Sequence, residues 1–183
     1  MVYMLLGTGF EETEAVAPID LLRRAGVSVA TVGIGGKVIV GSHGIPVTAD
    51  MELGQMDLTQ LDMIVLPGGM KGVASIKGCP EALEAVRFAW ENGRFVAAIC
   101  AAPAILAMLG ITDGRRATCY PGMEPEMRGA LQQAKLRQHR RRGADGGDPF
   151  SGLRHFPCGT EHRFAAADGA DASQPAGQDE HVR

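Results

Sequence analysis

Residues Phe95–Pro103 read FVAAICAAP, a pattern that is typical of an α/β protein. The five apolar residues Phe95–Ile99 predict a buried strand, and the segment that follows predicts a helix over 101–109. Cys100 lies between them, at the junction of the strand and the helix. A side chain at such a junction is exposed at the top of an α/β sheet, where many enzymes of this architecture hold a nucleophile.

Other short apolar segments repeat this arrangement along the chain. Strands that alternate with helices form a mostly parallel sheet that is covered by helices on both faces, so we expect this fold class. The predicted strands are 2–6, 27–34, 63–66, 95–99 and 117–120, the predicted helices are 8–25, 80–91 and 101–109, and a hairpin is predicted at 38–40 and 45–49.

The residues that could bind a ligand or take part in a reaction follow the ends of the predicted strands. Ligands of parallel sheets bind beyond the carboxyl ends of the strands. Gly68 and Gly69 follow the strand 63–66 there, and glycines let backbone N–H groups approach a ligand and stabilise an oxyanion. An ordinary loop would explain Pro67-Gly68-Gly69 equally well.

Cys100 is the sharpest of these features. The positive end of a helix dipole lowers the pKa of a cysteine from about 8.5 toward neutrality, so we expect a reactive thiolate. The alternative is a buried structural cysteine, which is common in proteins.

Glu14 is the second candidate, because it is the one polar member of a predicted apolar helix stripe. Desolvation at that position favours a protonated carboxyl, which can donate to a thiolate or carry a proton. The alternative is a solvated glutamate that interacts with the helix dipole, as we expect for Glu11 and Glu12. The stripe consists of Glu14, Pro18, Leu21 and Ala25.

The composition argues against several functions. The net charge of −3 gives no basic surplus for nucleic acid, and no apolar run reaches the roughly 18 residues of a membrane helix. The N-terminus lacks the pattern of a signal peptide, which predicts a cytoplasmic protein with free cysteines. We expect no metal, because no Cys/His spacing is typical of zinc, and no nucleotide, because Glu11 and Glu12 would meet its pyrophosphate.

These residues together resemble the ThiJ/PfpI superfamily, and within it the branch of protein deglycases and YajL-like proteins. The resemblance extends over about the first 130 residues. The matching segments are Gly9–Asp20, Leu22–Gly26, Val65–Gly69 and Ala97–Pro103.

The resemblance implies a flavodoxin-like three-layer sandwich and a homodimer. It implies that Cys100 is the nucleophile and Glu14 its hydrogen-bonded acid/base partner, and that Gly68, Gly69, Ala101 and Glu11 form the oxyanion and substrate pocket. The implied activity is cofactor-free glyoxalase or deglycase chemistry on reactive carbonyls or on glycated amines and thiols. A redox sensor or chaperone that uses oxidation of Cys100 is the alternative.

One departure from the family concerns a histidine that relatives often place near the cysteine. Tyr120 occupies that place here, so a cysteine peptidase or amidase lacks its base. Tyr120 and Arg24 remain candidates for residues that support the reactive groups without contacting the substrate.

The second departure is the C-terminal segment. Between Arg137 and Arg183 the only Leu, Ile, Val or Met residues are Leu153 and Val182, too few to offset the entropy of ordering. We therefore predict a domain over 1–135 and a disordered tail over 136–183.

The family's C-terminal strand and helix are not visible after about Leu131. We interpret this as a reading-frame shift between Leu131 and Gln138, the alternative being a natural extension. Such a loss would expose a sheet edge and an apolar face, so we expect low stability, aggregation and impaired activity.

Overall fold

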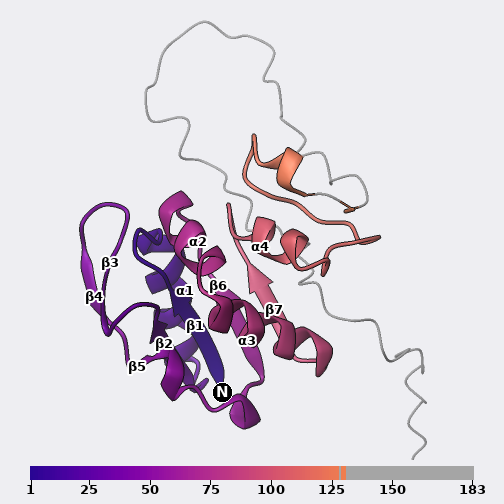
Figure 1. Cartoon of the computed structure of the whole chain (residues 1–183). Coiled ribbons are helices and arrows are strands. Elements are labelled where there is room, and N and C mark those ends of the chain that lie inside the picture. Colours follow the sequence, from indigo (N-terminus) through magenta and orange to yellow (C-terminus); the bar gives the residue numbers. More distant parts are fainter. Residues whose placement is uncertain (128, 131–183) are drawn as a thin grey trace, which may run out of the picture.

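A parallel sheet of five strands forms the centre of the protein in a computed structural model, which describes residues 1–127, 129 and 130 (Figure 1). The strand order is β5-β2-β1-β6-β7, and every pair of neighbours is parallel. Successive strands are added on both sides of β1, as in doubly wound folds. The strands are Val2–Leu6 (β1), Val29–Gly33 (β2), Met51–Glu52 (β5), Met63–Leu66 (β6) and Phe95–Ala98 (β7).

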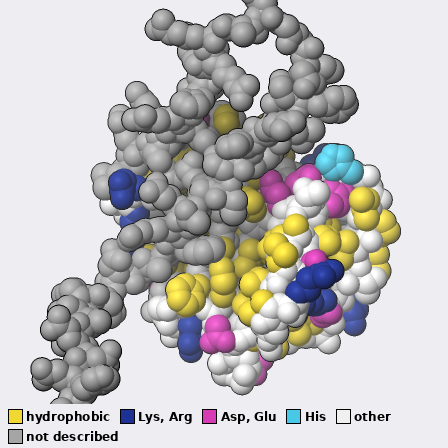
Figure 2. Space-filling view, turned by 180° about the vertical axis from the view of Figure 1, so that it is seen from behind, with side chains coloured by type: hydrophobic (Ala, Val, Ile, Leu, Met, Phe, Trp, Pro, Cys, Tyr) yellow, Lys and Arg dark blue, Asp and Glu magenta, His cyan; other side chains and the backbone are white. Residues whose placement is uncertain are grey.

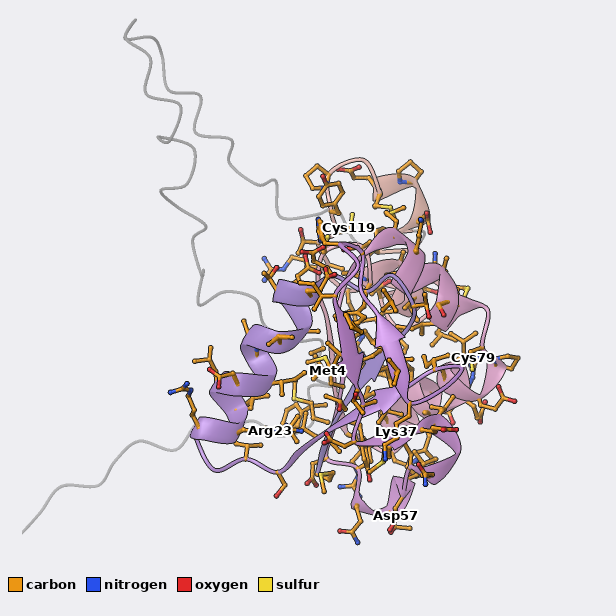
Figure 3. All side chains as sticks on the ribbon, turned by 90° about the vertical axis from the view of Figure 1, so that its left-hand side faces the viewer. Met4, Arg23, Lys37, Asp57, Cys79 and Cys119 are labelled. Atoms are coloured by element: carbon orange, nitrogen blue, oxygen red, sulfur yellow. The ribbon has the colours of Figure 1, made fainter. Side chains whose placement is uncertain are left out.

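Helices cover both faces of this sheet (Figure 3). On one face Tyr3 and Leu5 of β1 join a core cluster with residues of α2, α3 and α4. On the other face Met4 and Leu6 pack with residues of α1. This alternation along β1 confirms the predicted three-layer sandwich. The helices are Glu12–Arg24 (α1), Met70–Lys77 (α2), Pro80–Glu91 (α3) and Pro103–Met108 (α4), with short 3₁₀ turns at Leu53–Gln55, Leu58–Gln60 and Glu124–Glu126.

The predicted hairpin is also present. β3 (Val38–Val40) and β4 (Pro46–Thr48) form a separate antiparallel pair in which Ile39 faces Val47. Ile39 is buried in the same cluster as α1, so the hairpin lies on the α1 side of the sheet. Residues 41–45 form its turn.

The predicted helix after Cys100 is present, although it begins at Pro103 and has six residues. Two other local predictions are wrong. Residues 117–120 form no strand. The stripe headed by Glu14 is not the buried one, because Leu21 is 65% exposed and the buried positions of α1 are Glu12, Ala15 and Ile19. The helix α2 was not predicted.

Some predictions fall outside the described residues. They are the tail over 136–183, the frame shift between Leu131 and Gln138, and the loss of a C-terminal strand and helix. The domain boundary at residue 135 also falls there.

Among the helices that the structure does describe, none is long and apolar enough to cross a membrane.

Candidate active site

The backbone of Cys100 is held in an unfavourable conformation. Its φ of 60° is the one positive φ of a non-glycine residue in the described part of the chain. The left-handed region costs an L-residue about 1–2 kcal/mol, and such outliers concentrate at functional sites. The segment after β7 is fixed on both sides, because the Ile99 amide donates to the Leu66 carbonyl (3.2 Å) and the Tyr120 amide donates to the Cys100 carbonyl (2.7 Å).

Gly68 brings the two predicted catalytic side chains together. Its amide donates to Oε2 of Glu14 at 2.8 Å. A Cβ at Gly68 would lie 2.4 Å from Glu14 Oε2 and 3.2 Å from Cys100 Sγ. Glu14 and Cys100 therefore contact the same point of the chain, and no side chain fits between them.

Two backbone amides face the sulfur. The N–H groups of Ala101 and Gly69 lower the pKa of the Cys100 thiol, as hydrogen-bond donors near Sγ do. Gly69 has a φ of 89°, and a Cβ there would lie 2.5 Å from the Gly9 carbonyl oxygen. The donors that the family resemblance implies for an oxyanion pocket thus lie next to the sulfur of the predicted nucleophile.

The expected lowering of the Cys100 pKa is wrong in direction. Burial raises the pKa of the Cys100 thiol above its ordinary value, and the charge and hydrogen bond of Glu14 raise it further. The N–H groups of Ala101 and Gly69 lower it by less. The helix dipole contributes little because α4 is short and starts three residues later. The Cys100 thiol therefore holds its proton more strongly than an ordinary cysteine does.

A second polar cluster, which the sequence did not predict, joins α1 to the turn of the hairpin. The side chain of Glu12 is only 9% exposed. Its Oε1 accepts from the His43 amide (2.8 Å), and its Oε2 lies 2.9 Å from Nδ1 of His43 and 3.0 Å from the Ser42 hydroxyl. Burial would raise the pKa of Glu12, but the hydrogen bonds from His43 and Ser42 lower it to about 2.

Glu12 is not the solvated residue that we expected. The apolar spacing of Ala15 and Ile19, three and seven residues later, was the signal that could have placed it on the buried face. The donor atoms of Glu11, Glu12 and His43 lie within 4.8 Å of one another, the one such group of three in the described part. Two features disfavour a cation at this group. The N-terminus of α1 is electropositive, and the His43 ring already pairs with Glu12.

The other predicted site residues lie farther from the sulfur. The Glu11 carboxylate accepts from the hydroxyls of Thr13 (3.1 Å) and Ser42 (2.8 Å) and so faces the hairpin. Arg24 pairs with Asp20 near the end of α1 (2.8 Å), roughly 15 Å along the helix from Glu14. The structure does not bring Arg24 to Cys100.

Tyr120 contacts the site through its backbone. Its amide binds the Cys100 carbonyl, while its side chain is 54% exposed.

A separate hollow of about 370 Å³ includes neither Cys100 nor Glu14 and is not part of this site. It is lined by Leu53, Gly54, Met56, Leu58, Glu81 and Ala85.

The fold and the site define a flavodoxin-like α/β protein whose candidate active site contains one cysteine. Residues 1–140 match the DJ-1/PfpI family, and the chain belongs to this family.

Individual relatives agree with this assignment. Protein dj-1beta of Drosophila melanogaster is 35% identical over 125 residues, which are 68% of this chain and 67% of that protein. A protein of Pyrococcus abyssi named a deglycase is 33% identical over 126 residues, 69% of this chain and 75% of that protein. The chain spans only 26% of DJ-1 homolog B of Arabidopsis thaliana, at 40% identity.

Solved structures give the same result. A mutant of a DJ-1 superfamily protein from Salmonella typhimurium has a TM-score of 0.67 and 32% identity, and the match covers 71% of each chain. Toxoplasma gondii DJ-1, described as oxidized, has a TM-score of 0.65 and 31% identity over 68% of this chain and 69% of that one.

The strain at Cys100 leads to a prediction on stability. Cys100→Gly should be more stable than Cys100→Ala by about 1 kcal/mol, because both remove the sulfur but only glycine accepts a positive φ at no cost. Urea unfolding of the two variants measures this difference. Cys119 is the control, because without a positive φ its glycine variant should be no more stable than its alanine variant. An alanine variant at position 100 as stable as the glycine variant would contradict the strain.

The position of Glu14 leads to a prediction on the thiol. Glu14→Gln should lower the Cys100 pKa, because the substitution removes the negative charge and the acceptor that raise it. The pH dependence of Cys100 alkylation, followed on the peptide that contains Cys100, measures this shift. A higher thiol pKa in the variant would mean instead that Glu14 keeps its proton and donates to the thiolate.

Proposed function

We propose that this protein removes reactive carbonyls without a cofactor, as a glyoxalase or protein deglycase, with Cys100 as nucleophile and Glu14 as acid and base. The observation that carries the proposal is the shared contact of both side chains with Gly68. The names of the archaeal relatives, deglycases, agree with this class of substrate.

The first step is the addition of Cys100 to an aldehyde such as methylglyoxal. The thiol proton passes to Glu14 as the C–S bond forms, and the carbonyl oxygen becomes a hydroxyl when it takes up that proton. The N–H groups of Gly69 and Ala101 are placed to stabilise negative charge beside the sulfur. The product of this step is a hemithioacetal on Cys100.

The second step is an internal redox rearrangement that Glu14 catalyses. Its carboxylate removes the proton from the carbon attached to sulfur and returns it to the neighbouring carbon, while the hydroxyl proton of the hemithioacetal passes to the neighbouring ketone oxygen. These two transfers convert the hemithioacetal into the thioester of a 2-hydroxy acid. Water then hydrolyses the thioester to lactate and restores the thiol. Methylglyoxal and one water give one lactate, so no external oxidant, reductant or cofactor takes part.

Oxidation sensing at Cys100 is the second candidate function. The same N–H groups that face the sulfur would donate to the oxygen atoms of a sulfinate. The oxidized state of the Toxoplasma relative agrees with such a product. A peptidase has less support, because His43, the one histidine among the described residues, pairs with Glu12 and not with the cysteine.

A homodimer is the quaternary state that we propose. Five of the exposed large apolar side chains lie on α1 and on the β3–β4 hairpin, where a second copy would cover them. They are Val16, Leu21, Val38, Val40 and Ile45. Figure 2 shows hydrophobic side chains on this face next to the histidine and its acidic neighbours.

Turnover of methylglyoxal tests the enzymatic function. Cys100→Ser should abolish lactate formation, and Glu14→Gln should lower kcat by about 10²-fold even though it frees more thiolate, because the base is lost. Glu91→Gln, an exposed glutamate on α3, is the matched control and should keep the activity. An inactive wild-type protein that readily gains two oxygen atoms at Cys100 in dilute peroxide would favour the redox sensor.

Sedimentation velocity tests the dimer. Leu21→Glu should convert a wild-type dimer into a monomer, because it places a charge on a 65% exposed apolar position of α1. Met70→Glu, on α2 and 61% exposed, should leave the dimer intact. A monomeric wild-type protein, or dissociation by both variants alike, would contradict this interface.

A further inference from the structure

We propose that Glu12 and His43 are positioning residues, which fix the hairpin turn to the start of α1 and thereby hold Glu14 against Cys100. This role assigns the hairpin to the catalytic apparatus, although it lies outside the central sheet. The proposal rests on the proposed function of Glu14, but its test below does not require carbonyl turnover.

The turn of the hairpin is tightly bound to α1. Glu12 accepts from both the amide and the ring of His43, and the Ser42 hydroxyl lies within hydrogen-bond distance of Glu12 and Glu11. A Cβ at Gly41 would lie 2.3 Å from Glu12 Oε1, so glycine is needed for this approach. Backbone bonds add to it, since the Ser42 amide donates to the Phe10 carbonyl at 2.8 Å.

The start of α1 is in turn bound to the loop that carries the reactive contacts. The Glu11 amide donates to the Gly68 carbonyl at 3.0 Å, and the Gly68 amide donates back to Glu14 at 2.8 Å. Hydrogen bonds from His43 to Glu12 and from Glu11 to Gly68, joined through the first turn of α1, thus connect the hairpin turn to Gly68, which contacts both Glu14 and Cys100.

The burial of Glu12 explains why its contact with His43 fixes the position of the first turn of α1. The Glu12 side chain is 9% exposed, and a buried charge is stable only where it is paired and hydrogen-bonded. His43 is 70% exposed, so its ring serves the carboxylate and contributes little to the core. If the pair is broken, Glu12 must move toward water, and Glu14 lies only two residues farther along the same helical turn.

The rate of Cys100 alkylation near neutral pH tests the proposal independently of any carbonyl substrate. Glu12→Gln and His43→Ala should each accelerate alkylation by about threefold or more, because a displaced Glu14 no longer suppresses the thiolate. Thr48→Ala, an exposed position on β4, is the control and should leave the rate unchanged. Mass spectrometry of the peptide that contains Cys100 separates this thiol from the other cysteines.

A double-mutant cycle tests whether the effect passes through Glu14. In the Glu14→Gln background, adding Glu12→Gln should change the alkylation rate by less than about 1.5-fold. The Glu14 carboxylate, which Glu12→Gln would displace from the thiol, is already absent in that background. His43→Ala keeps the test valid if Glu12→Gln fails to fold, since His43 is an exposed residue. Circular dichroism melts establish that each variant is folded.

Two results would overturn the proposal. One is an unchanged alkylation rate in folded His43→Ala and Glu12→Gln. The other is an effect of the same size with and without Glu14. If alkylation responds as expected but the wild-type protein does not consume methylglyoxal, the proposed function fails while the positioning role stands.

Discussion

The lack of space at Gly68 is the constraint on which the site depends. The Cα of this residue lies against both the Glu14 carboxylate and the Cys100 sulfur, at distances that exclude even a methyl group. Because the approach is so close, a backbone amide binds Glu14 while the Glu14 carboxylate lies close enough to the thiol to raise its pKa. The positive φ of Cys100 is part of the same arrangement, since it turns the chain at the point where the two side chains meet.

The sheet topology explains why three distant segments meet there. β1, β6 and β7 are neighbours in the sheet and run in the same direction, so their carboxyl ends lie side by side. Glu14 follows β1, Gly68 follows β6 and Cys100 follows β7. A parallel sheet therefore assembles the site from short local motifs, in agreement with the rule that ligands bind at the carboxyl ends of strands.

The sequence predicted those features that depend on local pattern. The strand, cysteine and helix near Cys100 and the glycines after β6 were found because apolar runs and glycines mark such junctions directly. Glu12 was missed because the choice between two helix stripes depends on which one faces the sheet, and Ile19, not Leu21, packs there. The Cys100 pKa was predicted in the wrong direction because burial of the thiol, together with the charge of Glu14 from a distant part of the sequence, outweighs the local N–H groups.

A raised thiol pKa is compatible with a nucleophilic role for Cys100. A thiolate with a higher pKa is intrinsically more nucleophilic, although less of it is present at neutral pH. In the mechanism that we propose, the proton acceptor Glu14 lies next to the thiol, so the thiolate can form at the moment of attack, when the substrate oxygen takes up the developing charge.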